Sequence, residues 1–216
     1  MFKAVAFDVD GVLTKIDSIW MYMHKSLGTW ETAKRNMKLF FEGRITYEEW
    51  AILDVALWKG VPYSKILRIM ETVPLRKGVE EVFEVVKGLG LKVIAISGGL
   101  MPLLEVLSRK FKFDKMYACE LLKDGGLLNG QVKVHVTYSN KGEVLRKACS
   151  ELGIAPSQCI AIGDSEVDIP MFVASGFSIA FNPRNYRTAM MADLAIYNDE
   201  LHPVAEVIRM LCQRDM

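Results

Sequence analysis

Two aspartates separated by a single residue follow a short apolar run near the start of the sequence. The run AVAF (4–7) is followed by Asp8, Val9, Asp10 and Gly11. Small and β-branched residues in an unbroken run of this length are typical of a strand that is buried on both faces. Two carboxylates at the end of such a strand repel each other, so either one of them binds a proton or a divalent cation lies between them.

Two later apolar runs also end in polar residues. The residues that follow them are Ser97, Gly98 and Gly99 after KVIAI (92–96), and Gly163, Asp164 and, four residues further, Asp168 after CIAI (159–162). Ligands of open α/β sheets bind beyond the carboxyl ends of the parallel strands. We therefore expect Asp8, Asp10 and Asp164 to meet at one edge of a sheet.

Crowded carboxylates at this edge predict a hard cation. Two unit charges about 4 Å apart repel by about 4 kcal/mol at an effective dielectric constant near 20. Oxygen ligands favour Mg²⁺, which usually completes its coordination with water and substrate phosphate. The Ser97 hydroxyl, the backbone N–H of Gly98 and the ammonium group of Lys141 are suited to bind that phosphate. The sequence therefore indicates a phosphorylated substrate.

The elements that position these residues form an alternating pattern. Further short apolar runs occur at 115–121, 177–181 and 194–197, and helix-like stretches at 78–90 and 140–153 separate several of the strands. Strands that alternate with helices predict an α/β fold with a doubly wound, mainly parallel, Rossmann-like sheet.

Two segments depart from this alternation. Residues 16–74 are helix-like and aromatic-rich, which predicts a helical cap domain (16–74) inserted into an α/β core made of 1–15 and 75–216. Residues 121–138 contain an Asp-Gly-Gly turn, and Val132, Val134 and Val136 alternate with polar residues. This pattern predicts a small β-hairpin flap that stands off the core sheet.

Bulk composition excludes some classes of protein. The formal net charge of +1 gives no general attraction to nucleic acid or to anionic membranes. The four cysteines lack the spacing of a metal site, no apolar run is long enough to span a bilayer, and the early strand leaves no room for a signal peptide. We expect a cytoplasmic protein, a monomer or a homodimer, that binds a small phosphorylated metabolite and neither nucleic acid nor membrane.

Four segments of the sequence resemble, in order, the motifs of the haloacid dehalogenase-like superfamily. They are FDVDGVLT (7–14), ISGG (96–99), NKGE (140–143) and GDSEVDIPMF (163–172). The resemblance covers the whole chain and is closest to the phosphoserine phosphatase-like branch, which has a helical cap after the first motif.

The resemblance implies a role for each motif residue. Asp8 would be the nucleophile that forms an aspartyl-phosphate, and Asp10 the general acid and base. Mg²⁺ would be held by Asp8, by the backbone carbonyl of Asp10 and by Asp164. Ser97, Gly98 and Lys141 would bind the phosphoryl group, and Asp168 would orient the metal ligands or Lys141 from a second layer.

The substrate pocket departs from phosphoserine phosphatases. Asp17 stands where those enzymes carry a glutamate, and Asp54 where they carry the arginine that binds the carboxylate of serine. Phe41 and Tyr47 are the other pocket candidates, and Arg44 is the candidate to replace the missing cation. We interpret the tryptophans and methionines of the cap as packing residues, and assign no chemistry to the isolated His24.

The resemblance implies a Mg²⁺-dependent phosphatase of a small phosphomonoester, and other functions stay open. A phosphotransferase or a sugar phosphomutase would use the same aspartates. A dehalogenase would not need Asp10, and a non-catalytic regulator that binds a phosphorylated ligand would not need the nucleophile.

Overall fold

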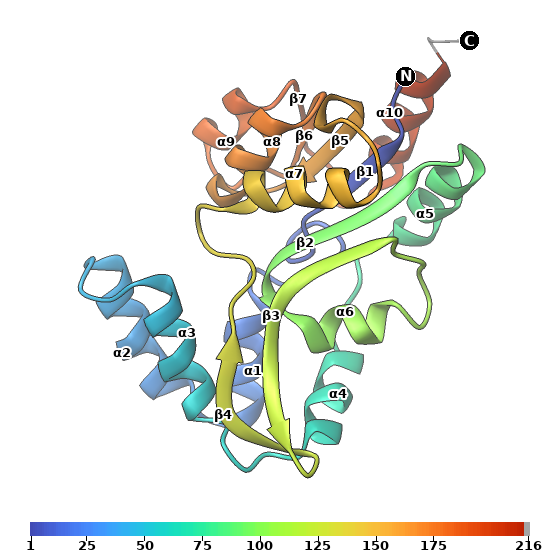
Figure 1. Ribbon diagram of the computed structural model, residues 1–216. Helices are drawn as coiled ribbons and strands as arrows, with labels where there is room; N and C mark the ends of the chain where they lie inside the picture. Colours follow the sequence, from blue (N-terminus) through green and yellow to red (C-terminus); the bar gives the residue numbers. More distant parts are fainter. Residues whose placement is uncertain (214–216) are drawn as a thin grey trace.

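The core of the protein is a seven-stranded sheet. The computed structural model describes residues 1–213, so the last three residues of the predicted core range lie outside it. The strands are β1 (Ala4–Phe7), β2 (Lys92–Leu100), β3 (Lys115–Asp124), β4 (Leu127–Lys133), β5 (Cys159–Gly163), β6 (Phe177–Phe181) and β7 (Leu194–Ile196). Their order is β4-β3-β2-β1-β5-β6-β7, and every neighbouring pair is parallel except β3–β4 (Figure 1). The predicted α/β fold class is confirmed.

Helices cover both faces of this sheet (Figure 1). They are α5 (Val79–Gly88), α6 (Met101–Leu107), α7 (Lys141–Glu151), α8 (Ile169–Ala174), α9 (Tyr186–Met191) and α10 (His202–Gln213), with short 3-10 turns at Pro156–Gln158 and Glu166–Asp168. Alternate residues of β1 point to opposite sides. Val5 and Phe7 pack in the cluster that contains α5 and α10, whereas Ala4 and Ala6 pack against α7 and α8. Burial on both faces explains why the strands read as unbroken apolar runs.

Four helices lie between β1 and α5: α1 (Ile19–Leu27), α2 (Trp30–Phe41), α3 (Tyr47–Ala56) and α4 (Tyr63–Glu71). Local signals fix their ends. Ser18 caps α1 by accepting the backbone N–H of Met21, and Gly28 ends it in the left-handed conformation. Thr46 and Glu49 form a capping box at the start of α3. No helix within residues 1–213 is long and apolar enough to cross a membrane.

The hairpin continues a core strand. The first half of β3 pairs with β2, and its second half pairs with β4. The predicted second strand was too long, because β4 ends at Lys133 and the valine at 136 is fully buried in a loop. Its alternation with polar residues reflects packing against the core and not strand pairing. The outer edge of β4 is covered by the segment before α4, where the N–H of Gly60 donates to the Leu128 carbonyl at 2.8 Å.

Candidate active site

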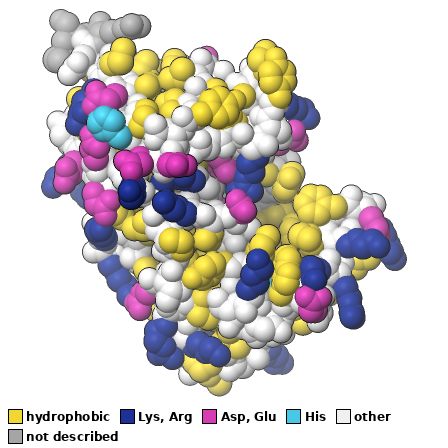
Figure 2. Space-filling view, turned by 180° about the vertical axis from the view of Figure 1, so that it is seen from behind, with side chains coloured by type: hydrophobic (Ala, Val, Ile, Leu, Met, Phe, Trp, Pro, Cys, Tyr) yellow, Lys and Arg dark blue, Asp and Glu magenta, His cyan; other side chains and the backbone are white. Residues whose placement is uncertain are grey.

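A cavity of about 480 Å³ lies where β1 and β2 end, and α1, α2 and α3 form its other wall. The strand ends contribute Asp8, Asp10, Ser97, Gly98 and Gly99, and α7 contributes Lys141. Figure 2 shows hydrophobic side chains around a hollow beside the lobe that carries α2 and α3. Ser165, Glu166 and Val167 of the fourth motif also line the cavity. The fold therefore brings all four motifs to one opening, as the sequence predicts.

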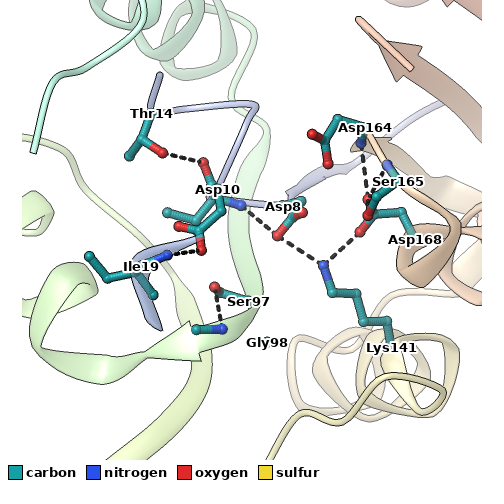
Figure 3. A network of polar contacts seen from close by, with 12 residues as sticks. Asp8, Asp10, Thr14, Ile19, Ser97, Gly98, Lys141, Asp164, Ser165 and Asp168 are labelled. Atoms are coloured by element: carbon teal, nitrogen blue, oxygen red, sulfur yellow. Dashed lines mark hydrogen bonds and ion pairs between the residues drawn. The ribbon is translucent and has the colours of Figure 1, made fainter. Parts of the chain in front are cut away.

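Lys141 joins two carboxylates at the base of the cavity (Figure 3). Its ammonium nitrogen lies 2.8 Å from Asp8 Oδ1 and 2.6 Å from Asp168 Oδ1, and all three side chains are buried. Asp8 Oδ1 also accepts the N–H of Val9 at 2.7 Å. No donor within residues 1–213 contacts Asp8 Oδ2, so this oxygen keeps its lone pairs for a ligand.

Both carboxylate oxygens of Asp168, in contrast, already accept hydrogen bonds. Its Oδ2 accepts the N–H groups of Asp164 and Ser165, both at 3.0 Å, and the Ser165 hydroxyl at 3.1 Å. Asp8, Asp164 and Asp168 carry oxygens within 4.8 Å of one another. Because the oxygens of Asp168 are already occupied, we infer that Asp8 and Asp164 are the better metal ligands of the three.

Asp164 is held by a cation that the sequence analysis missed. Arg184 follows β6 and donates from Nε to Asp164 Oδ2 at 2.7 Å, while its Nη2 donates to the Asp17 carbonyl at 2.9 Å. Asp164 Oδ1 is buried without a hydrogen-bond partner. The signal that could have identified Arg184 is its position three residues after a predicted parallel strand that ends at the same sheet edge.

Negative charge is in excess at this edge. Four carboxylates, those of Asp8, Asp10, Asp164 and Asp168, surround the two cations Lys141 and Arg184. With all groups ionised, these four carboxylates carry two more negative charges than Lys141 and Arg184 neutralise, and Arg76, which donates to the Gly11 carbonyl at 2.7 Å, also attracts Asp164. The unpartnered oxygens, the surplus charge and the all-oxygen donor set fit a hard divalent cation.

Burial of these carboxyl groups also disfavours their charged forms. It raises the pKa of Asp164 to about 6. Burial and the charge of Asp168 raise the pKa of Asp8, against the effect of Lys141. Burial works against the charge of Lys141, but Asp168 and Asp8 raise its pKa above the ordinary value. Lys141 is therefore a permanent cation, and a bound metal ion would help to ionise the two aspartates.

Asp10 lies beside this network and contacts the first residue of α1. Its Oδ2 accepts the N–H of Ile19 at 2.8 Å, and its Oδ1 is buried without a partner. Burial raises the pKa of Asp10 to about 6, although the Ile19 N–H and the charge of Lys141 work in the opposite direction. A carboxyl group with this pKa can both donate and accept a proton near neutral pH.

The end of β2 forms the wall opposite Lys141. Ser97 is buried, and its hydroxyl accepts the N–H of Gly99 at 2.9 Å. A Cβ at Gly99 would lie 2.5 Å from Ile19 Cγ2, so a larger residue does not fit beneath α1. The Gly98 carbonyl accepts the Tyr47 hydroxyl at 2.6 Å and the Trp20 indole N–H at 2.9 Å. Two donors from the predicted cap thus contact the predicted phosphate-binding strand.

The four pocket candidates all line the cavity. They are Asp17, Phe41, Tyr47 and Asp54. Asp17 and Phe41 belong to the exposed rim, whereas Asp54 is 2 % exposed. Arg44 does not line the cavity. Its side chain is exposed, and its Nη1 lies 3.7 Å from Glu42 Oε2 on the surface of the cap. The expectation that Arg44 replaces the missing cation was wrong.

Several tryptophans and methionines of the cap that were predicted to pack, and His24, to which no chemistry was assigned, also line the cavity. They are Trp20, Met21, His24, Trp30, Met37 and Trp50. His24 is not isolated: its Nε2 lies 3.1 Å from Asp54 Oδ2. Helical spacing does not distinguish an aromatic residue that packs in a core from one that faces a cavity, so the sequence carried no signal for this difference.

Comparisons with known proteins agree with this geometry. The family model described as haloacid dehalogenase-like hydrolase matches residues 2–176. The chain belongs to this family. Among its curated relatives is a phosphoserine phosphatase of Methanocaldococcus jannaschii, 29 % identical over 96 % of this chain and 98 % of the relative. Another, from a Polaromonas species, is 30 % identical over 88 % of this chain and 84 % of the relative.

Solved structures of phosphoserine phosphatases have the same architecture. A substrate-bound complex superposes with a TM-score of 0.81 at 27 % identity, covering 96 % of this chain and 98 % of the other. A phospho-aspartyl intermediate analogue superposes with a TM-score of 0.79 at 28 % identity, covering 95 % and 98 %. This haloacid dehalogenase-like hydrolase is thus an enzyme of the phosphatase type.

Proposed function

We infer that the chain is a Mg²⁺-dependent phosphomonoesterase that works through an aspartyl-phosphate on Asp8. The observation that supports this most directly is the position of Asp8 Oδ1, 2.8 Å from the buried ammonium of Lys141, in a cavity that Ser97 and Gly98 also line. A nucleophile, a cation for the transferred group and a general acid are then present in one opening.

Asp8 would attack phosphorus through Oδ2. Its Oδ1 is fixed by Lys141 and by the N–H of Val9, which sets the direction of the free oxygen. The O–P bond forms as the bond to the leaving alkoxide breaks. Two easier steps then replace one slow hydrolysis.

Asp10 would protonate the leaving alkoxide and then remove a proton from the water that hydrolyses the aspartyl-phosphate. Its pKa of about 6 supports both steps, because each protonation state is accessible near neutral pH. Its bond to the N–H of Ile19 fixes the carboxyl group relative to α1.

Asp8, Asp164 and the backbone carbonyl of Asp10 would hold Mg²⁺, as the excess of carboxylates over cations at this edge and the unpartnered oxygen of Asp164 support. When bound, the ion supplies Lewis-acid stabilisation of the charge on the phosphoryl oxygens. Ser97, Gly98 and Lys141 would bind the same oxygens, and Asp168 would orient Lys141 through the 2.6 Å contact. Arg184 would neutralise Asp164 in the absence of the ion.

We further propose that residues 16–74 act as a cap domain that opens to admit a small phosphorylated substrate and closes to exclude water. The bonds of Trp20 and Tyr47 to the Gly98 carbonyl support a closed arrangement in this structure. The cytoplasmic location and the monomeric or homodimeric state stay predictions.

The test is turnover of an aryl phosphate with Mg²⁺, with EDTA in its place, and with Asp8→Asn. We expect EDTA and Asp8→Asn each to reduce turnover by about 10³-fold or more, and added Mg²⁺ to restore the EDTA-treated enzyme. Asp124→Asn, the same change at the exposed hairpin tip, is the matched control. Full activity in EDTA would refute the metal assignment, and full activity of Asp8→Asn would refute the nucleophile. Transfer of phosphate to an alcohol and not to water would identify a phosphotransferase.

A further inference from the structure

The cap wall of the cavity carries acidic groups and no basic side chain of Lys or Arg. Among the cavity-lining residues within the described part of the chain, those from 16–74 include two aspartates, Asp17 and Asp54. Within that same described part, the only lysine and arginine on the cavity surface are Lys141 and Arg184, which come from outside this segment and are paired with the carboxylates of the proposed catalytic site. The part of a substrate that lies against the cap therefore meets negative charge.

Asp54 accepts one hydrogen bond in the cap and lies beside a buried imidazole ring. Asn36 Nδ2 donates to Asp54 Oδ1 at 2.8 Å, and His24 Nε2 lies 3.1 Å from Oδ2. His24 and Asp54 are 1 % and 2 % exposed, so this arrangement is part of the folded cap. The amide N–H of Asn36 is a donor that a carboxylate oxygen accepts.

A second contact holds the His24 ring in place. The indole N–H of Trp58 donates to Thr29 Oγ1 at 3.3 Å. Thr29 Oγ1 in turn lies 2.8 Å from His24 Nδ1. These contacts fix the His24 ring beside Asp54 in the cap wall.

Capacity for a ligand remains at this wall. Both His24 and Asp54 line the cavity, and the 3.1 Å contact between His24 Nε2 and Asp54 Oδ2 is not aligned as a hydrogen bond. A carboxylate has about four lone-pair positions, and Asn36 occupies one of them in good geometry. The remaining positions can accept N–H donors from a bound molecule.

Aromatic rings surround the same space. Trp20, Trp30, Trp50 and Tyr47 line the cavity together with Asp54. The face of an aromatic ring attracts a cation, and the attraction is larger when the cation is desolvated. In this structure Lys25 and Lys34 already lie 5.7 and 6.0 Å from the centre of the Trp30 ring, outside the cavity lining. A buried carboxylate with aromatic neighbours is complementary to an ammonium group.

We propose that the substrate is the phosphate ester of an amino alcohol without a carboxylate, with its primary or methylated ammonium group against Asp54 and the aromatic rings. This proposal rests on the proposed phosphomonoesterase function. A neutral polyol would bring no cation to Asp54 and to the aromatic rings beside it. A carboxylate on the leaving group would be repelled by Asp54 and Asp17, and the cap wall offers it no Lys or Arg.

The test compares esters that differ in one group. They are 2-aminoethyl phosphate, its neutral analogue 2-hydroxyethyl phosphate, choline phosphate, phosphoserine and a hexose phosphate, with an aryl phosphate as the reference. We expect kcat/KM for 2-aminoethyl or choline phosphate to exceed that for 2-hydroxyethyl phosphate by about 10- to 100-fold. Asp54→Asn should reduce this ratio to near one. Both values of kcat/KM are measured on one preparation, so partial unfolding of the variant lowers both by the same factor and leaves their ratio unchanged.

Glu42→Gln is the matched control, since it removes an exposed carboxylate of the same lobe outside the cavity and should leave the ratio unchanged. A preference for phosphoserine or the hexose phosphate, or a ratio that Asp54→Asn does not change, would overturn the amine proposal while aryl phosphate turnover upholds the proposed function. If no ester is hydrolysed, the proposed function fails. The dissociation constants of the 2-aminoethyl and 2-hydroxyethyl esters, measured by calorimetry, then still test the amine preference.

Discussion

The raised pKa of Asp10 makes the stability of the metal-free protein depend on pH in a defined direction. Its pKa rises from 3.8 in the unfolded chain to about 6 in the folded protein, because burial disfavours the charged form. The folded state therefore binds this proton more tightly than the unfolded state does. Stability from Asp10 is fully present below about pH 4 and is lost as the pH rises to about 6.

The size of this loss follows from the shift. At about 1.4 kcal/mol for each pKa unit, ionisation of Asp10 in the folded protein costs about 2 to 3 kcal/mol above pH 6. Asp10→Asn removes this cost. The asparagine oxygen can still accept the Ile19 N–H, whereas its amide group would replace the unpartnered Oδ1, at a cost that does not vary with pH.

The assay is denaturant unfolding of wild type and Asp10→Asn in EDTA at several values between pH 4 and pH 7.5. We expect the free energy of unfolding of Asp10→Asn, relative to wild type, to rise by about 2 to 3 kcal/mol across this range. The acid end of the series is the internal control, because there the difference contains only the pH-independent cost. A difference that stays constant with pH would refute the buried, perturbed state of Asp10.

Two further substitutions test how the site is assembled. Asp168→Asn should lower the free energy of unfolding by about 3 to 5 kcal/mol, measured with denaturant, because buried Lys141 loses one of its two carboxylate partners; an unchanged stability would contradict the importance of this pair. Gly11→Ala should abolish phosphatase turnover and Mg²⁺ binding measured by calorimetry, because its Cβ would lie 2.1 Å from Asp164 Oδ2. Gly28→Ala has a similar positive φ but open space, so it should cost only about 1 to 2 kcal/mol of stability and keep activity; equal loss of activity in both variants would show that the contact with Asp164 is irrelevant.

The strand ends were predictable because the signal is local. An unbroken apolar run reports a strand buried on both faces, and the polar residues that follow it must lie at the carboxyl end. Asp8, Ser97 and Asp164 could therefore be placed at one sheet edge from residue order alone. The end of β4 could not be predicted in this way. Val136 alternates with polar residues because it is buried in the core, although it lies beyond the end of the strand.

The cap side of the cavity was not predictable in the same way. His24 and Asp54 are 30 residues apart and meet only because α1 and α3 pack together, and Arg184 reaches Asp164 from another strand. The sequence also suggested Arg44 as a substrate-binding cation, which the fold places on an exposed surface. Contacts between distant helices depend on packing angles that residue spacing does not encode.

The sequence by itself determined the order of the strands along the chain, the acidic residues at their ends and the family motifs, because each is written within a few consecutive residues. Only the tertiary structure decided which tryptophans face the cavity, that Asp54 is buried beside His24, and that Arg184 holds Asp164. The physical reason is that burial and pairing are properties of the whole packed chain, and the same residue pattern is compatible with a solvated surface, a core or a binding site.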